Sequence, residues 1–261
     1  MVQINMREML EAGVHFGHQI RRWNPKMKPY ILGKKNGIYI IDLQTSIEMF
    51  KTSLQFIADT VAAGKDVLVV GTKKQAQSII EEIAEATGMH YVNKRWLGGL
   101  LTNFGMIKKS IDKLMELDEM KKDGRWEVKS KKEQSRLEKV YKKLYRSLWG
   151  LRRMTTLPGV VIVIDSTFED IAICEAKRMN IPIVAVVDTN ANPEDVHFPV
   201  PGNDDAIRSI RLFISKFGEA VTEGRNRKIQ ESANAQQLAA DKAAAEAAAA
   251  AETSAPAEKE N

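Results

Sequence analysis

Cysteine is almost absent from this sequence, which has only Cys174 in 261 residues. A single thiol excludes an internal disulfide framework and a zinc site built from several cysteines. Because the chain has no use for oxidised thiols, it suits a reducing compartment, and we expect a cytoplasmic protein. Cys174 lies in a predicted helix, three residues after Ile171. We expect it to be buried as a small apolar side chain rather than to act as a nucleophile.

Long hydrophobic runs are also missing. No stretch of the sequence approaches the roughly 18 consecutive apolar residues that a membrane-spanning helix needs. The opening MVQINMREML lacks the basic and then apolar order of a secretory signal. We therefore expect a soluble protein that is not secreted and has no membrane partner.

Motifs for catalysis or cofactor binding are equally scarce. The turn GTKKQA after DVLVVG has some likeness to a phosphate-binding turn, but it fits neither glycine-rich consensus. His15 and His18 are spaced like metal ligands, yet no cysteine or third histidine lies nearby in sequence. We predict no catalytic residue, no bound metal, no cofactor and no small-molecule substrate.

Alternating strand and helix patterns are what the sequence does contain. DVLVVG, VVIVID and IPIVAVVDT are apolar runs typical of buried parallel strands, and residues 38–41 and 89–92 predict two short strands. Helices are expected after Asp42, over 72–87 and 168–180, and after Asn203 or Asp204. The last of these should turn Ile207, Ile210, Leu212, Ile214 and Phe217 inward, after a proline-rich loop. The pattern predicts an α/β fold with a doubly wound parallel sheet.

The stretch Phe104–Arg153 follows a different rule. Apolar residues recur there at steps of three and four in two runs, separated by KKDGRW, in which Gly124 can end a helix. This predicts a protruding antiparallel coiled-coil hairpin, 104–153, inserted into a single α/β body formed by 1–103 and 154–224. Residues 225–261 are rich in alanine but have no apolar stripe, so we expect a disordered tail.

Positive charge is concentrated in two places. Residues 104–155 contain sixteen lysines and arginines against eight acidic residues, a net +8 in a chain whose total is +5. Residues 1–40 contain seven against two, a net +5, with aromatic side chains between them. The hairpin's excess favours phosphate binding over a merely solvated face. For the basic N-terminal extension, two interpretations stay open: a segment that lies along nucleic acid, or a loop that its aromatic rings pack on the body.

Several long motifs occur in an order that resembles one family. MREMLEAGVHFGH, RRWNPKMKPYI, NKRWLGGLLTNF and FPVPGNDDAIRSIRLF, among others, resemble the bacterial small-subunit ribosomal protein S-two family from Val2 to about Arg225. The resemblance implies a flavodoxin-like body with a coiled-coil hairpin and a structural role without catalysis. It also implies small-subunit ribosomal RNA and neighbouring ribosomal proteins, including the S-one protein, as partners.

The resemblance and the charge distribution together predict where RNA is contacted. The predicted residues belong to the N-terminal extension, to the stretch before the hairpin and to the hairpin itself. They are Arg21, Arg22, Trp23, Lys26, Lys28, Lys94, Arg95, Lys108, Lys109, Lys131, Lys132, Arg136, Lys142, Lys143 and Arg146.

Two other functions are consistent with parts of the sequence. Gly71, Asp165 and Asp188 follow predicted parallel strands, where α/β enzymes that bind nucleotides or phosphoesters place their sites. An Asp beside a hydroxyl residue at such a position is more commonly a cap, which is the interpretation we favour. Alternatively, the basic hairpin could recruit an acidic protein. Residues 156–224, with a net charge of −6 from five basic and eleven acidic residues, are expected to face away from RNA.

Overall fold

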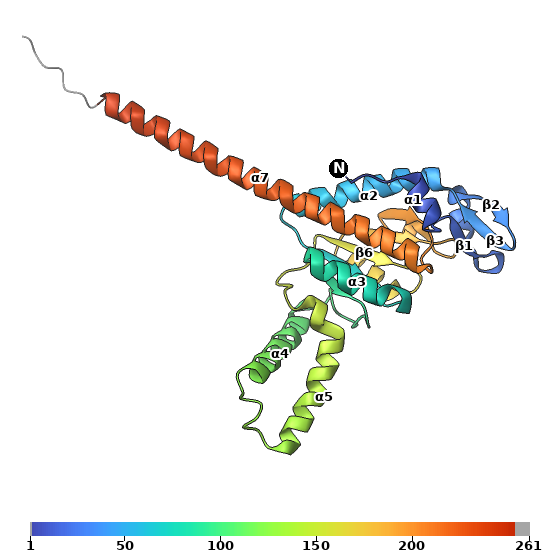
Figure 1. Cartoon of the computed structure of the whole chain (residues 1–261), viewed down its shortest axis with the longest axis horizontal. Helices are drawn as coiled ribbons and strands as arrows, with labels where there is room; N and C mark the ends of the chain where they lie inside the picture. Colours follow the sequence, from blue (N-terminus) through green and yellow to red (C-terminus); the bar gives the residue numbers. More distant parts are fainter. Residues whose placement is uncertain (1, 254–261) are drawn as a thin grey trace, which may run out of the picture.

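A computed structural model describes the backbone of residues 2–253 and the side chains of residues 2–233. Within this part of the chain, no helix is long and apolar enough to cross a membrane. The body, the two helices α4 (Phe104–Lys122) and α5 (Lys131–Leu148) and the long helix α7 (Ile207–Thr253) are readily distinguished in Figure 1.

The centre of the body is a parallel sheet whose five strands have the order β5-β4-β6-β7-β8. This order is consistent with a flavodoxin-like fold, and the prediction of a parallel α/β sheet is confirmed. The strands are β4 (Val67–Val70), β5 (His90–Val92), β6 (Val160–Ile164), β7 (Ile183–Val187) and β8 (Phe198–Pro201).

Helices cover both faces of this sheet because both faces are apolar. Val67 and Val69 of β4 point into a core shared with α2 (Leu43–Ala62), α3 (Lys74–Thr87) and the start of α7 (Ile207–Thr253). Leu68 and Val70 point into a second core, which includes α6 (Asp170–Arg178) and the base of α4 and α5. Figure 1 shows α2 and α7 lying side by side across one layer.

The N-terminal residues form a small antiparallel sheet of order β1-β3-β2 after the helix α1 (Met6–Glu11). The strand at Ile38–Ile41 (β3) was predicted, whereas β1 (Phe16–Gln19) and β2 (Ile31–Lys35) were not. Between β1 and β2 lie two 3₁₀ turns, η1 (Ile20–Arg22) and η2 (Pro25–Tyr30). Proline is compatible with the start of η2, because a first-turn residue needs no backbone N–H partner.

The inserted stretch folds into α4 (Phe104–Lys122) and α5 (Lys131–Leu148), followed by the 3₁₀ turn η3 (Trp149–Leu151). Gly124 takes a left-handed φ of 74° just after α4, as expected of the residue that ends it. Ser130 and Glu133 form a capping box that starts α5. Ile111 and Leu114 of α4 are buried, and Figure 1 shows the two helices extending together from the body.

Three details differ from the sequence-based expectations. Cys174 is exposed, because it lies on the outer face of α6 while Ile173 and Ala176 take the inward positions. Ile207 was expected to face inward but is 60% exposed. Phe213 was not among the residues expected to face inward, and it is buried in the core. The proline-rich loop contains the strand β8, in which Pro199 and Pro201 are tolerated at the edge of the sheet.

The C-terminal helix is longer than the sequence suggested. α7 continues without interruption past residue 225 to Thr253, consistent with the high helix propensity of alanine. Arg225 and Arg227 still contact the body, through the carbonyl oxygens of Thr87 and Gly88 and through Asp59. The expectation of disorder for 254–261 lies outside the described residues.

Candidate nucleic-acid interface

The cations of α5 line up on its outer face. Lys132, Arg136, Lys139, Lys143 and Arg146 recur at steps of three and four, and all are exposed. At 3.6 residues per turn they form one stripe along the helix. The apolar side chains of α5 lie about half a turn away from this stripe and face α4. They are Leu137, Tyr141, Leu144 and Leu148. The helix therefore presents a continuous cationic ridge to solvent while its opposite side packs.

Acidic side chains of the two helices are largely engaged within the arm. Glu138 of α5 forms an ion pair with Lys121 of α4 at 2.7 Å, and Asp118 forms one with Lys122 at 2.8 Å. Asp118 also accepts a hydrogen bond from the hydroxyl of Tyr141 at 3.0 Å. The pairing leaves the ridge on α5 as a surface of uncompensated positive charge.

Predicted contact residues before and at the start of α4 are also exposed, namely Lys94, Arg95, Lys108 and Lys109. Lys94 donates a hydrogen bond to the side chain of Gln77 at 3.0 Å. The loop that carries Lys94 and Arg95 into the arm is held by Glu175, a buried carboxylate of α6. The base of the arm is thus tied to the body by polar contacts as well as by packing.

The basic N-terminal extension packs through aromatic rings and keeps its cations exposed. Trp23 is half-buried and packs on Tyr39 with ring centroids 5.2 Å apart, so its ring serves the fold. Arg21, Arg22 and Lys28 are exposed, as is Lys26, which forms an ion pair with Glu194. Tyr30 packs against the core of the body, and the cations remain on the surface of the segment.

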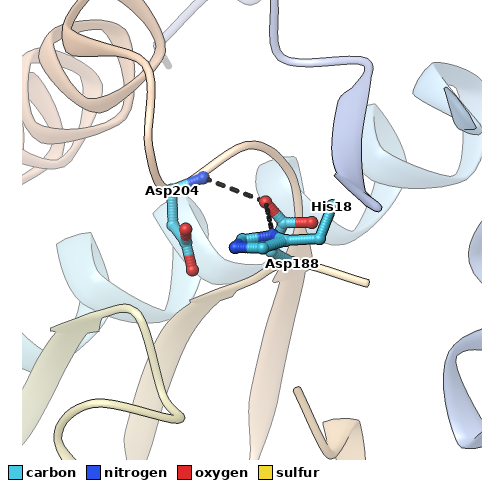
Figure 2. Close-up of side chains that lie close together, drawn as sticks. All are labelled: His18, Asp188 and Asp204. Carbon is cyan, nitrogen blue, oxygen red and sulfur yellow. Dashed lines mark hydrogen bonds and ion pairs between the residues drawn. The ribbon is translucent and has the colours of Figure 1, made fainter. Parts of the chain in front are cut away.

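A cluster of charged groups lies at the carboxyl ends of the parallel strands. Nδ1 of His18 is 3.0 Å from Oδ2 of Asp188, and its Nε2 is 3.2 Å from Asp205. The backbone N–H of Asp204 donates to the same Asp188 oxygen at 3.5 Å, as Figure 2 shows. The interaction of the His18 ring N–H with the Asp188 carboxylate raises the pKa of His18 to about 8, outweighing the opposing effect of burial. His18 therefore carries a positive charge at neutral pH.

Lys73 supplies the second positive charge of this cluster. Its ammonium lies 3.1 Å from Asp165, 2.7 Å from Asp204 and 2.6 Å from Asp205. Burial works against the charged ammonium, but the attraction of these carboxylates is larger and raises the pKa of Lys73. Burial and the neighbouring carboxylates raise the pKa of Asp204 to about 7. Asp165 and Asp188 were expected at this edge of the sheet, but the participation of His18, Lys73, Asp204 and Asp205 was not predicted, because the members come from five separate segments.

His18, Asp188 and Asp204 could also hold a metal ion. Their ligand atoms all lie within 4.8 Å of one another, and one imidazole with two carboxylates is a donor set that suits zinc. Oδ2 of Asp204 is buried without a hydrogen-bond partner in the described part of the chain, and it could accept a proton or a cation. His15, which is spaced from His18 like a metal ligand in the sequence, does not belong to this group and packs against Phe16 instead.

The residues proposed for an enzyme have structural explanations. Asp165 accepts backbone hydrogen bonds from Thr167 and Phe168 at 3.1 Å each, so the predicted cap is confirmed. Asp188 likewise accepts from the backbone N–H of Thr189. A Cβ at Gly71 would lie 2.5 Å from the side chain of Ile80, so this glycine serves close packing of α3 on the sheet. The geometry gives no support to the enzyme alternative.

Comparison with known proteins identifies the family of this chain. The family model of ribosomal protein S2 matches residues 9–224. The small ribosomal subunit protein uS2 of Geotalea uraniireducens is 53% identical over 244 residues, covering 92% of this chain and 95% of that protein. The proteins of the same name from Koribacter versatilis and Desulfatibacillum aliphaticivorans are each 56% identical, over 86% of this chain and 74% and 76% of their own lengths. The chain therefore belongs to the ribosomal protein S2 family.

Proposed function

We propose that this protein is a structural, non-enzymatic component of the small ribosomal subunit in the cytoplasm, where it binds ribosomal RNA and supports neighbouring proteins in translation. Relatives that cover most of the chain are named small ribosomal subunit proteins. The observation that carries the RNA-binding part is the exposed cationic ridge on α5, which lies opposite the side that packs. Such a surface fits a phosphate backbone, to which regularly spaced cations contribute affinity without reading sequence.

RNA is held at two places in this proposal. One is the arm with its junction, and the other is the N-terminal extension, whose cations stay exposed while its rings pack. The residues proposed are the fifteen predicted from the sequence, with Trp23 acting through its packing on Tyr39 rather than through a free ring face. Fourteen of the fifteen are lysines or arginines that the structure leaves exposed.

The division of the chain follows from these roles. We assign 1–103 and 154–224 to one flavodoxin-like body, 104–153 to an inserted coiled-coil arm and 225–261 to a C-terminal extension. The coiled-coil assignment rests on the three-and-four spacing of apolar residues and on the ion pair between Lys121 and Glu138. The acidic surface of 156–224 suits basic neighbouring proteins, and the family resemblance makes the S-one protein one such partner.

Replacement of four ridge cations tests the RNA-binding role. We expect the variant Lys132→Gln, Arg136→Gln, Lys143→Gln, Arg146→Gln to bind small-subunit ribosomal RNA more weakly and with a smaller salt dependence. Each lost phosphate contact should reduce the slope of log K against log salt concentration by about 0.9. Filter binding at several salt concentrations measures both quantities.

A charge-matched variant separates site from net charge. Lys51, Lys177, Arg178 and Arg208 are exposed on the body outside the proposed contacts, and their replacement by Gln removes the same charge. This control should retain most of the wild-type slope. Equal slopes for the wild type and the ridge variant would contradict the role of the arm, and failure of the wild-type protein to sediment with small subunits would contradict the ribosomal assignment.

A further inference from the structure

A third group of cations gathers at the amino-terminal edge of the parallel sheet, outside the contacts predicted from the sequence. Lys65 lies two residues before β4, Arg153 lies between η3 and β6, and Arg225 and Lys228 come from α7. All four are exposed. The amino ends of parallel strands share one edge of a sheet, and α7 crosses that edge after packing on α2 and α3.

Two adjoining hollows of the surface bring these four side chains together. A Cβ at Gly64 would lie 2.9 Å from Nζ of Lys228, and a Cβ at Gly88 would lie 2.8 Å from Nη1 of Arg225. A cavity of about 70 Å³ is lined by Lys65, Arg225 and Lys228 together with Met89. Met89 also lines the adjoining hollow, where Arg153 lies. The four cations therefore border one continuous surface.

Fold stability explains only one of them. Arg225 donates to the carbonyl oxygens of Thr87 and Gly88, where it satisfies the C-terminal end of α3. In the described part of the chain, no ion pair joins Lys65, Arg153 or Lys228 to a carboxylate. The nearby Asp66 is 3.6 Å from His90, and Glu85 is engaged by Arg152 at 2.7 Å. Three unpaired cations are left facing solvent.

This surface is continuous with the base of the arm. The hollow beside Arg153 is lined by Tyr91 and Gly150, and the same two residues line a cavity of about 190 Å³ that contains Lys94 and Arg146. β5 is the outermost strand of the sheet, and this series of hollows follows β5 from α5 to α7. A nucleic-acid strand that leaves the ridge at Arg146 would meet cations along the whole path.

We propose that Lys65, Arg153 and Lys228 bind phosphates of the same ribosomal RNA that the arm binds, and so form a third anchoring surface. The inference rests on the proposed function. RNA is a better fit than a protein partner because isolated cations can hold a phosphate backbone by themselves, whereas a protein interface is built around an apolar core.

The test compares the binding of three full-length variants to small-subunit ribosomal RNA: a triple variant of the third surface, its matched control and the ridge variant described above. The triple variant Lys65→Gln, Arg153→Gln, Lys228→Gln leaves Arg225 in place, so that the end of α3 stays capped. We expect the salt slope to fall by between about 2 and 3, since each phosphate contact contributes about 0.9. The matched control Lys51→Gln, Arg178→Gln, Arg208→Gln should leave the slope close to the wild-type value. Thermal melts of all three establish that the fold is intact.

The outcomes distinguish this inference from the function on which it rests. If the ridge variant loses slope and the Lys65, Arg153, Lys228 variant does not, the third surface is wrong and the arm assignment stands. If neither loses slope, both the third surface and the arm assignment are wrong, whereas failure of the wild-type protein to bind the RNA would overturn the proposed function itself. A photo-crosslinking amino acid at position 228 in assembled subunits gives an independent result: crosslinks to RNA support the proposal, and crosslinks to protein alone overturn it.

Discussion

Glu175 is the residue on which the connection between body and arm depends most. It is 6% exposed, and its two oxygens accept hydrogen bonds from Nε1 of Trp96, from the backbone N–H groups of Gly99, Leu101 and Thr102 and from the hydroxyl of Thr102. Burial alone would raise the pKa of Glu175, but these donors outweigh it and lower that pKa. One ionised carboxylate thus orders the whole loop before α4.

Glu175→Gln should destabilise the protein by about 3 kcal/mol at pH 7. The amide turns its own donors toward N–H groups and loses the charge that strengthens each hydrogen bond. Urea unfolding measures the difference in free energy. Asp170→Asn, on the exposed side of the same helix, is the control and should change stability by no more than about 0.5 kcal/mol.

The same variant has a defined pH dependence. The folded pKa of Glu175 is depressed, so its stabilisation is fully present above the unfolded value of about 4.3 and is lost as the pH falls through the folded value. The difference in unfolding free energy between wild type and Glu175→Gln should therefore stay constant from pH 7 to pH 5 and become smaller in stronger acid. A gap that widened in acid would contradict the role of the ionised carboxylate.

Individual residues also show what sequence patterns can and cannot predict. The cap made by Asp165 was predictable, because it depends on residues two and three positions away. The ion pairs of Lys73 with Asp165, Asp204 and Asp205 were not, since they join residues at least 92 positions apart in the sequence. Exposure of Cys174 was missed for a different reason: Ile171, three residues earlier on the same face of α6, was expected to point inward but is itself 57% exposed.

Among the elements, those with a clear period were predictable and those without one were not. The apolar strands β4, β6 and β7 and the helices α2 and α3 lie within a few residues of their predicted bounds. β1 and β2 were missed because they are mostly exposed and polar, with no apolar alternation. β8 was missed because prolines normally argue against a strand, a rule that fails at a sheet edge.

The turn η3 joins the arm to the sheet edge, and Gly150 makes this contact possible. A Cβ there would lie closer than van der Waals distance to the backbone oxygen of Tyr91. Gly150→Ala should force η3 away from β5 and destabilise the protein by about 2 kcal/mol. Gly98→Ala, with nothing within 4 Å of the new Cβ, should change stability by well under 1 kcal/mol. Equal unfolding free energies for the two variants would show that the contact is unimportant.

For the molecule as a whole, α7 is both a body helix and an extension, and Figure 1 shows its later turns leaving the body. Among the described side chains, the last to contact the body are Arg225, Arg227 and Lys228. A chain that ends after residue 233 should therefore keep its wild-type unfolding midpoint in urea. A chain that ends after Gly218 should have an unfolding free energy lower by about 3 kcal/mol and a lower urea midpoint, because Ala220 and Val221 are buried. Similar midpoints for both truncations would contradict this division.

The contact of Gly150 with Tyr91 also bears on how quickly the sheet can form. β4 pairs with both β5 and β6, and the entire arm separates these two partners in sequence. Contacts between α4 and α5 are local and form early in folding, whereas pairing of distant strands waits for a long loop to close. A hairpin whose ends meet at η3 shortens that loop, since closure entropy grows with the number of free residues. Early formation of the arm thereby reduces the entropy cost of pairing β6 with β4.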